Sequence, residues 1–116
     1  MVVRVGLDLV EVARIERAMR RPGFVERVLT PAERAICTTP ARVAGRWAGK
    51  EAVAKAVGTH LGWQQVEILP DAEGRPFVQV RDEIFNSQWF ALHLSITHER
   101  THAAAVAVLE ELKVQG

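Results

Sequence analysis

The sequence of 116 residues lacks several features that would define its class at once. Its single cysteine, Cys37, cannot form an internal disulfide and has no companion Cys or His at zinc-site spacing, so we expect it to be buried. No apolar run approaches the length of a membrane span, and charges begin too early for a signal peptide. These absences favour a cytoplasmic protein without a membrane segment.

The charge balance and the missing catalytic motifs exclude further classes. The formal net charge is +1, and 48% of residues are hydrophobic, which is typical of a globular protein. Nothing in this balance demands a nucleic-acid partner. The chain also lacks a glycine-rich phosphate loop, a G-x-S-x-G turn and an H-E-x-x-H helix, so the common nucleotide-binding, hydrolase and zinc-protease templates do not apply.

The hydrophobic pattern predicts a single α+β domain over residues 1–116. Thr30, Pro31 and Glu33 form the signature of a capping box at the start of a short helix. No repeat or linker interrupts the chain. The expected elements are a strand at 2–10, helices at 11–21, from 31, and at 41–58, and hairpins at 66–80 and 91–110.

Asp8 stands in an unexpected place, inside the apolar strand segment V-G-L-D-L-V. An ionised carboxylate near a core is unfavourable unless a cation or hydrogen-bond donors meet it. Asp8 could cap the following helix, pair with an arginine or bind a metal ion, and the pattern is compatible with all three. Gly6 lies two residues earlier on the same face, so we expect room for a bulky group beside this carboxylate.

A second carboxylate, Glu51, lies in the helical segment G-R-W-A-G-K-E-A-V-A-K-A-V-G. Trp47, Glu51 and Lys55 fall at i, i+4 and i+8 and share one stripe of the helix. Small alanines beside this stripe would let phosphate groups approach. Two carboxylates with open positions suit Mg²⁺, whose other ligands are usually water and phosphate, whereas an ordinary Glu51–Lys55 surface pair is the alternative.

Polar groups mark the last predicted hairpin. His93, Ser95 and Thr97 alternate with apolar residues along one strand, and His98 stands at the turn. A turn histidine is usually solvent-exposed and without a role, but histidine and hydroxyl groups near a basic helix also suit phosphate contacts. The pattern is compatible with both interpretations.

The first predicted helix is rich in arginine. Arg14, Arg17 and Arg21 lie near one helical stripe, where an acidic protein could dock. A solvated basic face explains the same charges equally well.

Five blocks, in their order along the chain, resemble the signature of a known family. They are GLDLVEVARI, RVLTPAE, AGRWAGKEAVAKAVGT, EGRP and HLSITHERTHAAAVAV. Together they resemble the holo-acyl-carrier-protein synthases, the small 4′-phosphopantetheinyl transferases, over nearly the whole chain. The resemblance implies that coenzyme A gives its 4′-phosphopantetheine arm to a serine of acyl carrier protein, with magnesium, releasing adenosine 3′,5′-bisphosphate.

The resemblance also implies roles for particular residues. Asp8 and Glu51 would hold Mg²⁺, and Lys55 would stabilise the leaving phosphate or assist proton movement. The serine would be deprotonated by Glu51, by Asp8 or by a water on the metal ion. The family is typically homotrimeric, with active sites between subunits. The implied coenzyme contacts are Arg46, Lys50, Lys55, Gly74, Pro76, Ser95 and His98, and the implied carrier-protein contacts are Arg14, Arg21 and Phe24.

Three positions and one segment depart from the family pattern. Trp47, Gly49 and His60 replace more common residues, and the segment between Val80 and Ala91 is shorter than the usual helix there. We therefore expect differences in the coenzyme pocket or in the packing of the trimer. Two alternatives remain: a non-enzymatic module that binds carrier protein or nucleotide on the same fold, and a plain interaction domain without a metal.

Overall fold

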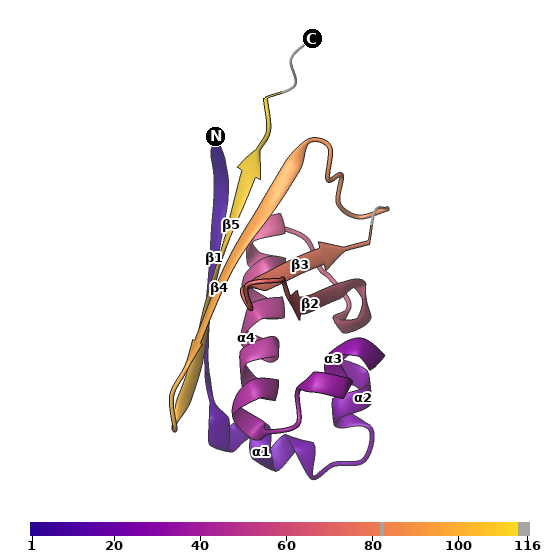
Figure 1. Ribbon diagram of the computed structural model, residues 1–116, viewed down its shortest axis with the longest axis vertical. Helices are drawn as coiled ribbons and strands as arrows, with labels where there is room; N and C mark the ends of the chain where they lie inside the picture. The colour runs from indigo at the N-terminus through magenta and orange to yellow at the C-terminus, as the bar shows by residue number, and fades with distance from the viewer. Residues whose placement is uncertain (82, 114–116) are drawn as a thin grey trace.

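The computed structural model describes residues 1–81 and 83–113, and its elements follow the predicted order (Figure 1). The α+β class is confirmed, and the one short helix that the pattern did not predict is α2. The strands are β1 (Val2–Glu11), β2 (Val66–Pro70), β3 (Pro76–Val80), β4 (Phe90–His98) and β5 (His102–Glu111). The helices are α1 (Val12–Met19), α2 (Phe24–Val28), α3 (Pro31–Ile36) and α4 (Pro40–Val57), followed by a 3₁₀ turn, η1 (Trp63–Gln65).

The five strands form two separate antiparallel sheets. Three of them pair in the order β1-β5-β4, and β2 and β3 form a two-stranded ribbon. The prediction that the last hairpin forms the core of the sheet is confirmed, because β5 is the central strand. Register places Asp8 opposite Ala105, and His98 opposite Ala103.

Helix α4 covers the inner face of the three-stranded sheet (Figure 1). The inner-facing β5 residues are short, with Ala103, Ala105 and Ala107 all buried, so the helix lies close to the strands. A Cβ on Gly6 would overlap the carbonyl oxygen of Ala52. The expected room for a bulky group beside Gly6 is therefore a wrong prediction, because the backbone of α4 occupies it.

The small residues of α4 allow it to pack closely in the core; they do not form a surface that phosphate groups could approach. Ala48, Ala52 and Ala56 are fully buried, so they do not form the low outer surface that the sequence suggested. A Cβ on Gly49 would lie 2.8 Å from Cδ1 of Ile68. Glycine at this position is therefore explained by the close contact of α4 with β2.

Local capping signals define the ends of the helices. The Thr30 hydroxyl accepts a hydrogen bond from the Glu33 backbone N–H (3.3 Å), and the Glu33 carboxylate accepts one from the Thr30 N–H (2.7 Å). This is the predicted capping box. Helix α4 ends at Gly58, whose φ of 83° lies in the left-handed region that favours glycine. Arg4 Nε and Nη2 donate to the carbonyls of Ala56 and Val57, at 3.0 and 2.8 Å.

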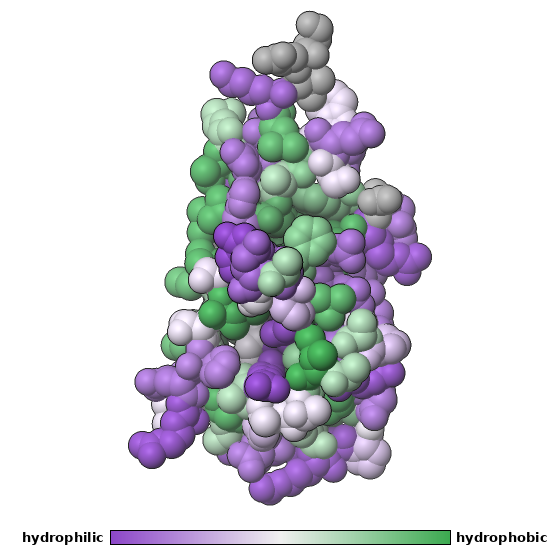
Figure 2. Space-filling model, viewed as in Figure 1, coloured by the Kyte–Doolittle hydropathy of each residue, from purple (hydrophilic) through white to green (hydrophobic). Residues whose placement is uncertain are grey.

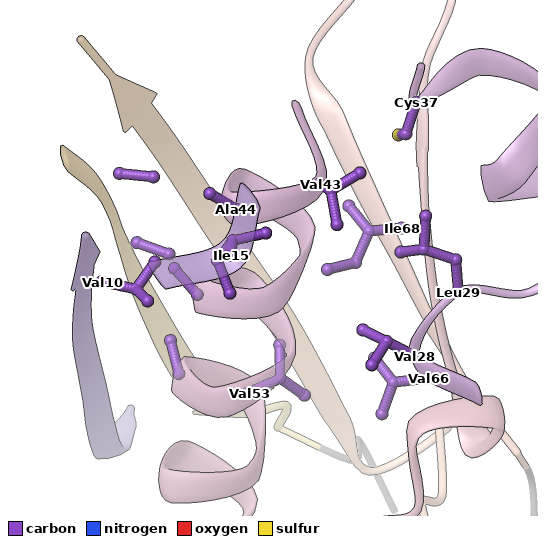
Figure 3. Packing of buried hydrophobic residues seen from close by; sticks show 14 of the residues in the cluster. Val10, Ile15, Val28, Leu29, Cys37, Val43, Ala44, Val53, Val66 and Ile68 are labelled. Atoms are coloured by element: carbon purple, nitrogen blue, oxygen red, sulfur yellow. The ribbon is translucent and has the colours of Figure 1, made fainter. Parts of the chain in front are cut away.

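The core packs α4 against the three-stranded sheet, against β2 and against the N-terminal helices (Figure 3). Ile15 of α1, Leu29 after α2 and Ile68 of β2 are almost completely buried and point into it. Cys37 is 5% exposed, as expected. Among the helices described, none is long and apolar enough to cross a membrane.

The outer face of the three-stranded sheet is apolar and open to solvent. On β1 the outward side chains of Val5, Leu7 and Leu9 are 58%, 64% and 66% exposed. Figure 2 shows hydrophobic surface along the left edge of the view, where Figure 1 places β1. Val106 and Val108 of β5 continue this outer face, and both are half-buried.

Candidate active site

The close contact of β1 with α4 brings Asp8 to Lys55. Lys55 Nζ donates to the Leu7 carbonyl at 2.8 Å and lies 3.5 Å from Asp8 Oδ1. The Asp8 side chain is only 16% exposed, whereas that of Lys55 is 54% exposed. Asp8 therefore pairs with a lysine rather than an arginine, and Glu11, not Asp8, occupies the N-cap position of α1.

Burial removes the Asp8 carboxylate from water, and the neighbouring positive charges offset the cost of this only in part. Desolvation raises the pKa of Asp8 above its ordinary value, and the charges of Lys55 and Arg14 oppose this rise without cancelling it. A carboxylate in this state gains from a further cation. This is the electrostatic setting expected of a metal ligand.

Glu51 lies one helical turn before Lys55 and is half-buried. Within residues 1–81 and 83–113, neither a hydrogen bond nor an ion pair joins Glu51 to Lys55, because Lys55 turns toward β1. The surface pair considered from the sequence is therefore not formed. Glu51 instead lines a cavity between α4 and the residues around η1.

The residues present fit Mg²⁺. Asp8 and Glu51 offer carboxylate oxygens, the ligands that Mg²⁺ prefers; Asp8 contacts Lys55, and Glu51 lies one helical turn before Lys55 in α4. In the described part of the chain, no group of three or more His, Cys, Asp and Glu side chains gathers to form an all-protein metal cage. Mg²⁺ commonly takes only one or two carboxylates and fills its other positions with water and phosphate, so this donor set suits it.

A second group of predicted residues lies around the first half of α4. Arg46 Nε donates to the Ile68 carbonyl at 2.9 Å, which fixes the guanidinium beside β2. His98 approaches the same half of the helix, since a Cβ on Gly45 would lie 4.0 Å from the His98 ring. Pro76 pairs with Pro70 at the end of the β2–β3 ribbon, and Gly74 forms its turn with φ of 84°.

Lys50 is a wrong prediction as a coenzyme contact. Its side chain is 2% exposed, and Nζ donates to Glu33 Oε1 (2.6 Å) and to the carbonyls of Val28 and Trp63 (2.8 Å each). All three ammonium protons are thus used inside the protein. Burial lowers the pKa of Lys50, and the Glu33 carboxylate opposes that shift.

Ser95 lies apart from the other predicted residues. It points to the outer face of the sheet, where it lines a shallow pocket with Leu7 and Val106. The predicted alternation of β4 is confirmed, but within one chain the sheet separates Ser95 from the α4 side on which Asp8 and Glu51 lie.

The predicted carrier-protein contacts divide into exposed and buried residues. Arg14 and Arg21 are exposed, with Arg14 Cζ 5.7 Å from the Trp47 ring centroid and Arg21 Cζ 6.0 Å from that of Phe24. Phe24 is only 3% exposed and stacks on Trp47 at 5.9 Å. Phe24 as a surface contact is therefore a wrong prediction; it supports the surface from beneath.

Sequence reasoning missed Trp63 and the role of Glu33. The Trp63 ring lies 4.5 Å from Trp47, and Glu33 accepts hydrogen bonds from Lys50 and from the Ile68 backbone N–H. The capping-box spacing marked Glu33 only as a local residue. No periodic signal in the sequence pointed to Trp63.

Comparison with known proteins now gives the class of the protein. Residues 4–107 match the family model of the 4′-phosphopantetheinyl transferase superfamily, and the chain belongs to this superfamily. The predicted family and enzyme class are confirmed.

Two similar relatives narrow the class further. The chain is 42% identical to the holo-[acyl-carrier-protein] synthase of Exiguobacterium sp., covering 96% of this chain and 94% of the relative. It is also 42% identical to that of Geobacillus kaustophilus, covering 97% and 92%.

Solved structures agree with these relatives. The holo-(acyl-carrier-protein) synthase of Bacillus anthracis in complex with CoA (3′,5′-ADP) is 35% identical with a TM-score of 0.84, covering 97% of this chain and 99% of that one. The holo-[acyl-carrier-protein] synthase of Helicobacter pylori in complex with coenzyme A is 30% identical with a TM-score of 0.85, covering 91% and 99%.

Proposed function

We propose that this protein is a holo-[acyl-carrier-protein] synthase. It transfers 4′-phosphopantetheine from coenzyme A to a serine of apo acyl carrier protein, depends on Mg²⁺ and releases adenosine 3′,5′-bisphosphate. One observation carries the proposal: the close contact of Gly6 with Ala52 holds Asp8 beside Lys55. The Asp8 carboxylate is desolvated, with a raised pKa, and Lys55 follows Glu51 by one helical turn. The activity of the relatives supports the same assignment.

The reaction is a phosphoryl transfer. The serine oxygen forms a bond to the phosphorus that carries the pantetheine arm, and the bond from that phosphorus to the bridging oxygen breaks. Asp8 and Glu51 would hold Mg²⁺, which when bound neutralises charge on the pyrophosphate. Lys55 Nζ, anchored by the Leu7 carbonyl and half exposed, would donate to an oxygen of the leaving phosphate.

The adenosine end of coenzyme A would lie along the first half of α4. Arg46 and His98 offer cationic and hydrogen-bonding groups there, and the turn at Gly74 and Pro76 offers backbone groups. Lys50 is left out of this set because its ammonium group is consumed by buried acceptors.

A homotrimer would bury the exposed apolar residues on the outer face of the three-stranded sheet. Leu7 and Leu9 leave a large apolar surface open in a single chain, and such patches mark association sites. Association through this face would also let Ser95, which lies on it, contribute to the active site of a neighbouring subunit. We place the assembly in the cytoplasm, in keeping with the sequence expectation.

Acyl carrier protein would dock on the exposed arginines of α1. Arg14 lies close enough to Asp8 to influence its pKa, so a partner bound at Arg14 would reach the proposed reaction centre. Arg21 extends the basic surface, and Trp47 and Phe24 support the two arginines from below. An acidic recognition surface on acyl carrier protein would complement the positive charge of these arginines.

The test is to incubate the protein with apo acyl carrier protein, coenzyme A and Mg²⁺ and to follow the mass of the carrier. We expect the carrier to gain one phosphopantetheine group, and we expect Asp8→Ala and Glu51→Ala to abolish the gain. Full activity of both variants would overturn the metal-site assignment. If no carrier tested is modified, the non-enzymatic binding module is favoured.

A further inference from the structure

The side chain of Arg4 joins the start of β1 to the end of α4, which lie side by side because strand and helix run in opposite directions (Figure 1). Its Nε donates to the Ala56 carbonyl at 3.0 Å, and its Nη2 donates to the Val57 carbonyl at 2.8 Å. The last carbonyls of a helix have no partner within the helix, and the negative end of its dipole favours a cation. Arg4 therefore stabilises the last turn of α4 against β1.

The same turn carries Lys55, the lysine that contacts Asp8. Lys55 immediately precedes Ala56 and Val57, so the two hydrogen bonds from Arg4 fix the backbone from which the Lys55 side chain extends. Lys55 Nζ donates to the Leu7 carbonyl at 2.8 Å and lies 3.5 Å from Asp8 Oδ1. Both contacts are to β1, so the position of Nζ depends on how closely the last turn of α4 is held to the strand.

The contacts of the Lys55 side chain are weak by themselves. The side chain is 54% exposed, and an exposed ion pair adds little stability while the ordered lysine loses rotamer entropy. Helix ends also fray, and Lys55 lies in the last turn before Gly58. Loss of the Arg4 hydrogen bonds would therefore let the ammonium group move away from Asp8 even while the rest of α4 stays folded.

The end of α4 is shaped to receive this guanidinium group. Gly58 adopts a φ of 83°, and a Cβ there would lie 2.9 Å from Arg4 Nε and 3.0 Å from Arg4 Cζ. Glycine at this position therefore satisfies both the left-handed backbone and the close approach of the arginine. Arg4 itself is exposed, so its contribution is the placement of one helical turn rather than the filling of the core.

We propose that Arg4 is a positioning residue for the transfer reaction: it holds the last turn of α4 against β1 and so places Lys55 Nζ beside Asp8. The inference deepens the proposed function and rests on it. Arg4 acts through Lys55, which in the proposed function donates to the leaving phosphate, and itself touches neither coenzyme A nor carrier protein. Arg4 lies outside the five blocks that carry the family resemblance, the first of which begins at Gly6, so no motif pointed to it.

The experiment measures kcat and the KM values for coenzyme A and carrier protein in Arg4→Met and Arg4→Lys. Arg4→Met keeps most of the length of the side chain but removes both donors. It should lower kcat about tenfold or more while changing both KM values by less than about threefold, because a small displacement of a group that acts in the transition state lowers the rate more than the binding. Arg4→Lys keeps the charge and a donor near the two carbonyls, so it should recover most of the lost rate.

Arg34 supplies a matched control, because it makes the same kind of contact at the end of another helix. Its Nη1 donates to the carbonyl of Leu29, the residue that ends α2, at 3.0 Å and to the Glu26 carbonyl at 3.4 Å. Arg34→Met should lower the melting temperature about as much as Arg4→Met does, yet leave kcat within about twofold of the parent. All rates are measured well below the lowest melting temperature, so that a loss of kcat does not reflect unfolding.

A double variant tests whether Arg4 acts through Lys55. In the Lys55→Met background, Arg4→Met should lower the residual kcat by less than about twofold, since the group that it positions is already absent. Three results would overturn the inference while leaving the proposed function intact: a parental kcat in Arg4→Met, an equal loss of kcat in Arg34→Met, or effects of Arg4→Met and Lys55→Met that multiply in full. If the unaltered protein modifies no carrier, the proposed function itself fails and the inference fails with it.

Discussion

Gly6 and Ala52 touch through their backbones, since a Cβ on Gly6 would overlap the Ala52 carbonyl oxygen and lie 2.9 Å from the Ala56 nitrogen. This contact sets the distance between β1 and α4 and therefore the position of Asp8 beside Lys55. Gly6→Ala should move the strand away from the helix. We expect a loss of about 1–3 kcal/mol in the free energy of unfolding, together with a loss of transfer activity.

Chemical denaturation and initial rates check this prediction together. A Gly6→Ala protein with the stability and activity of the parent would show that the close contact does not position Asp8.

Asp8 should lower the stability of the fold at neutral pH while being required for activity. Because its folded pKa is raised, the stabilising contribution of Asp8 is complete only below the unfolded pKa, near 3.8, and is lost as pH rises through the folded pKa. At neutral pH the ionised carboxylate therefore destabilises the fold. Asp8→Asn should melt at a higher temperature than the parent at pH 7, by a margin that vanishes in acid, and should be inactive.

Mg²⁺ gives a second readout at the same position. Added Mg²⁺ should raise the melting temperature of the parent but not that of Asp8→Asn, since a ligand that binds only the folded state stabilises it. A lower melting temperature of Asp8→Asn at pH 7, or an equal response to Mg²⁺, would contradict the account.

The two lysines on either side of Glu51 should behave in opposite ways. Lys50→Met leaves the Glu33 carboxylate buried without its cation and should destabilise the fold by about 3–5 kcal/mol. Lys55 is half exposed, so Lys55→Met should change stability by less than about 1 kcal/mol while removing most activity.

Urea denaturation and initial rates measure both effects. The result that would count against this assignment is a stable, inactive Lys50→Met protein, because that would place Lys50 in the reaction rather than in the core.

The outer face of the sheet should control assembly. Leu7→Lys places a charge in the centre of the exposed apolar surface and should convert trimers to monomers in light scattering. Ile36→Lys, at a residue that is 40% exposed on α3, is the matched control and should leave the assembly unchanged. A monomeric parent, or a Leu7→Lys protein that still associates, would contradict the trimer.

Charge reversal on α1 should affect the carrier protein and not the coenzyme. Arg14→Glu should raise the KM for acyl carrier protein about tenfold or more with little change in the KM for coenzyme A. Lys113→Glu, an exposed reversal two residues after the end of β5, is the control. Equal effects of the two reversals would show that α1 is not the docking surface.

Phe24 should contribute to the stability of the fold rather than to contact with the carrier protein. Phe24→Ala should destabilise the protein by about 3–5 kcal/mol, because the ring is buried against Trp47. A fully stable Phe24→Ala protein with a raised KM for carrier protein would restore Phe24 as a surface contact.

The elements that sequence reasoning predicted well are those with local causes. The Thr30–Glu33 capping box, the Gly58 helix end and the alternation of β4 all depend on residues within a few positions of one another. Their physical reasons are visible in the sequence itself.

The failures all concern partners far away in the chain. Lys50 looked like a surface cation because nothing near it in sequence shows that Val28, Glu33 and Trp63 surround it. Gly6 looked like free space because the α4 backbone that fills it lies more than forty residues away. Alternation placed Ser95 on one face of β4, but only the fold shows that α4 covers the other.

The most direct test is the initial rate of carrier modification, measured by mass spectrometry across a range of Mg²⁺ concentrations. The parent and Glu16→Ala, which removes an exposed carboxylate on α1, should show the same Mg²⁺-dependent rate. Asp8→Ala and Glu51→Ala should each lose about a hundredfold or more at every Mg²⁺ concentration. Transfer that proceeds at the parental rate without Mg²⁺, or with either carboxylate removed, would contradict the account.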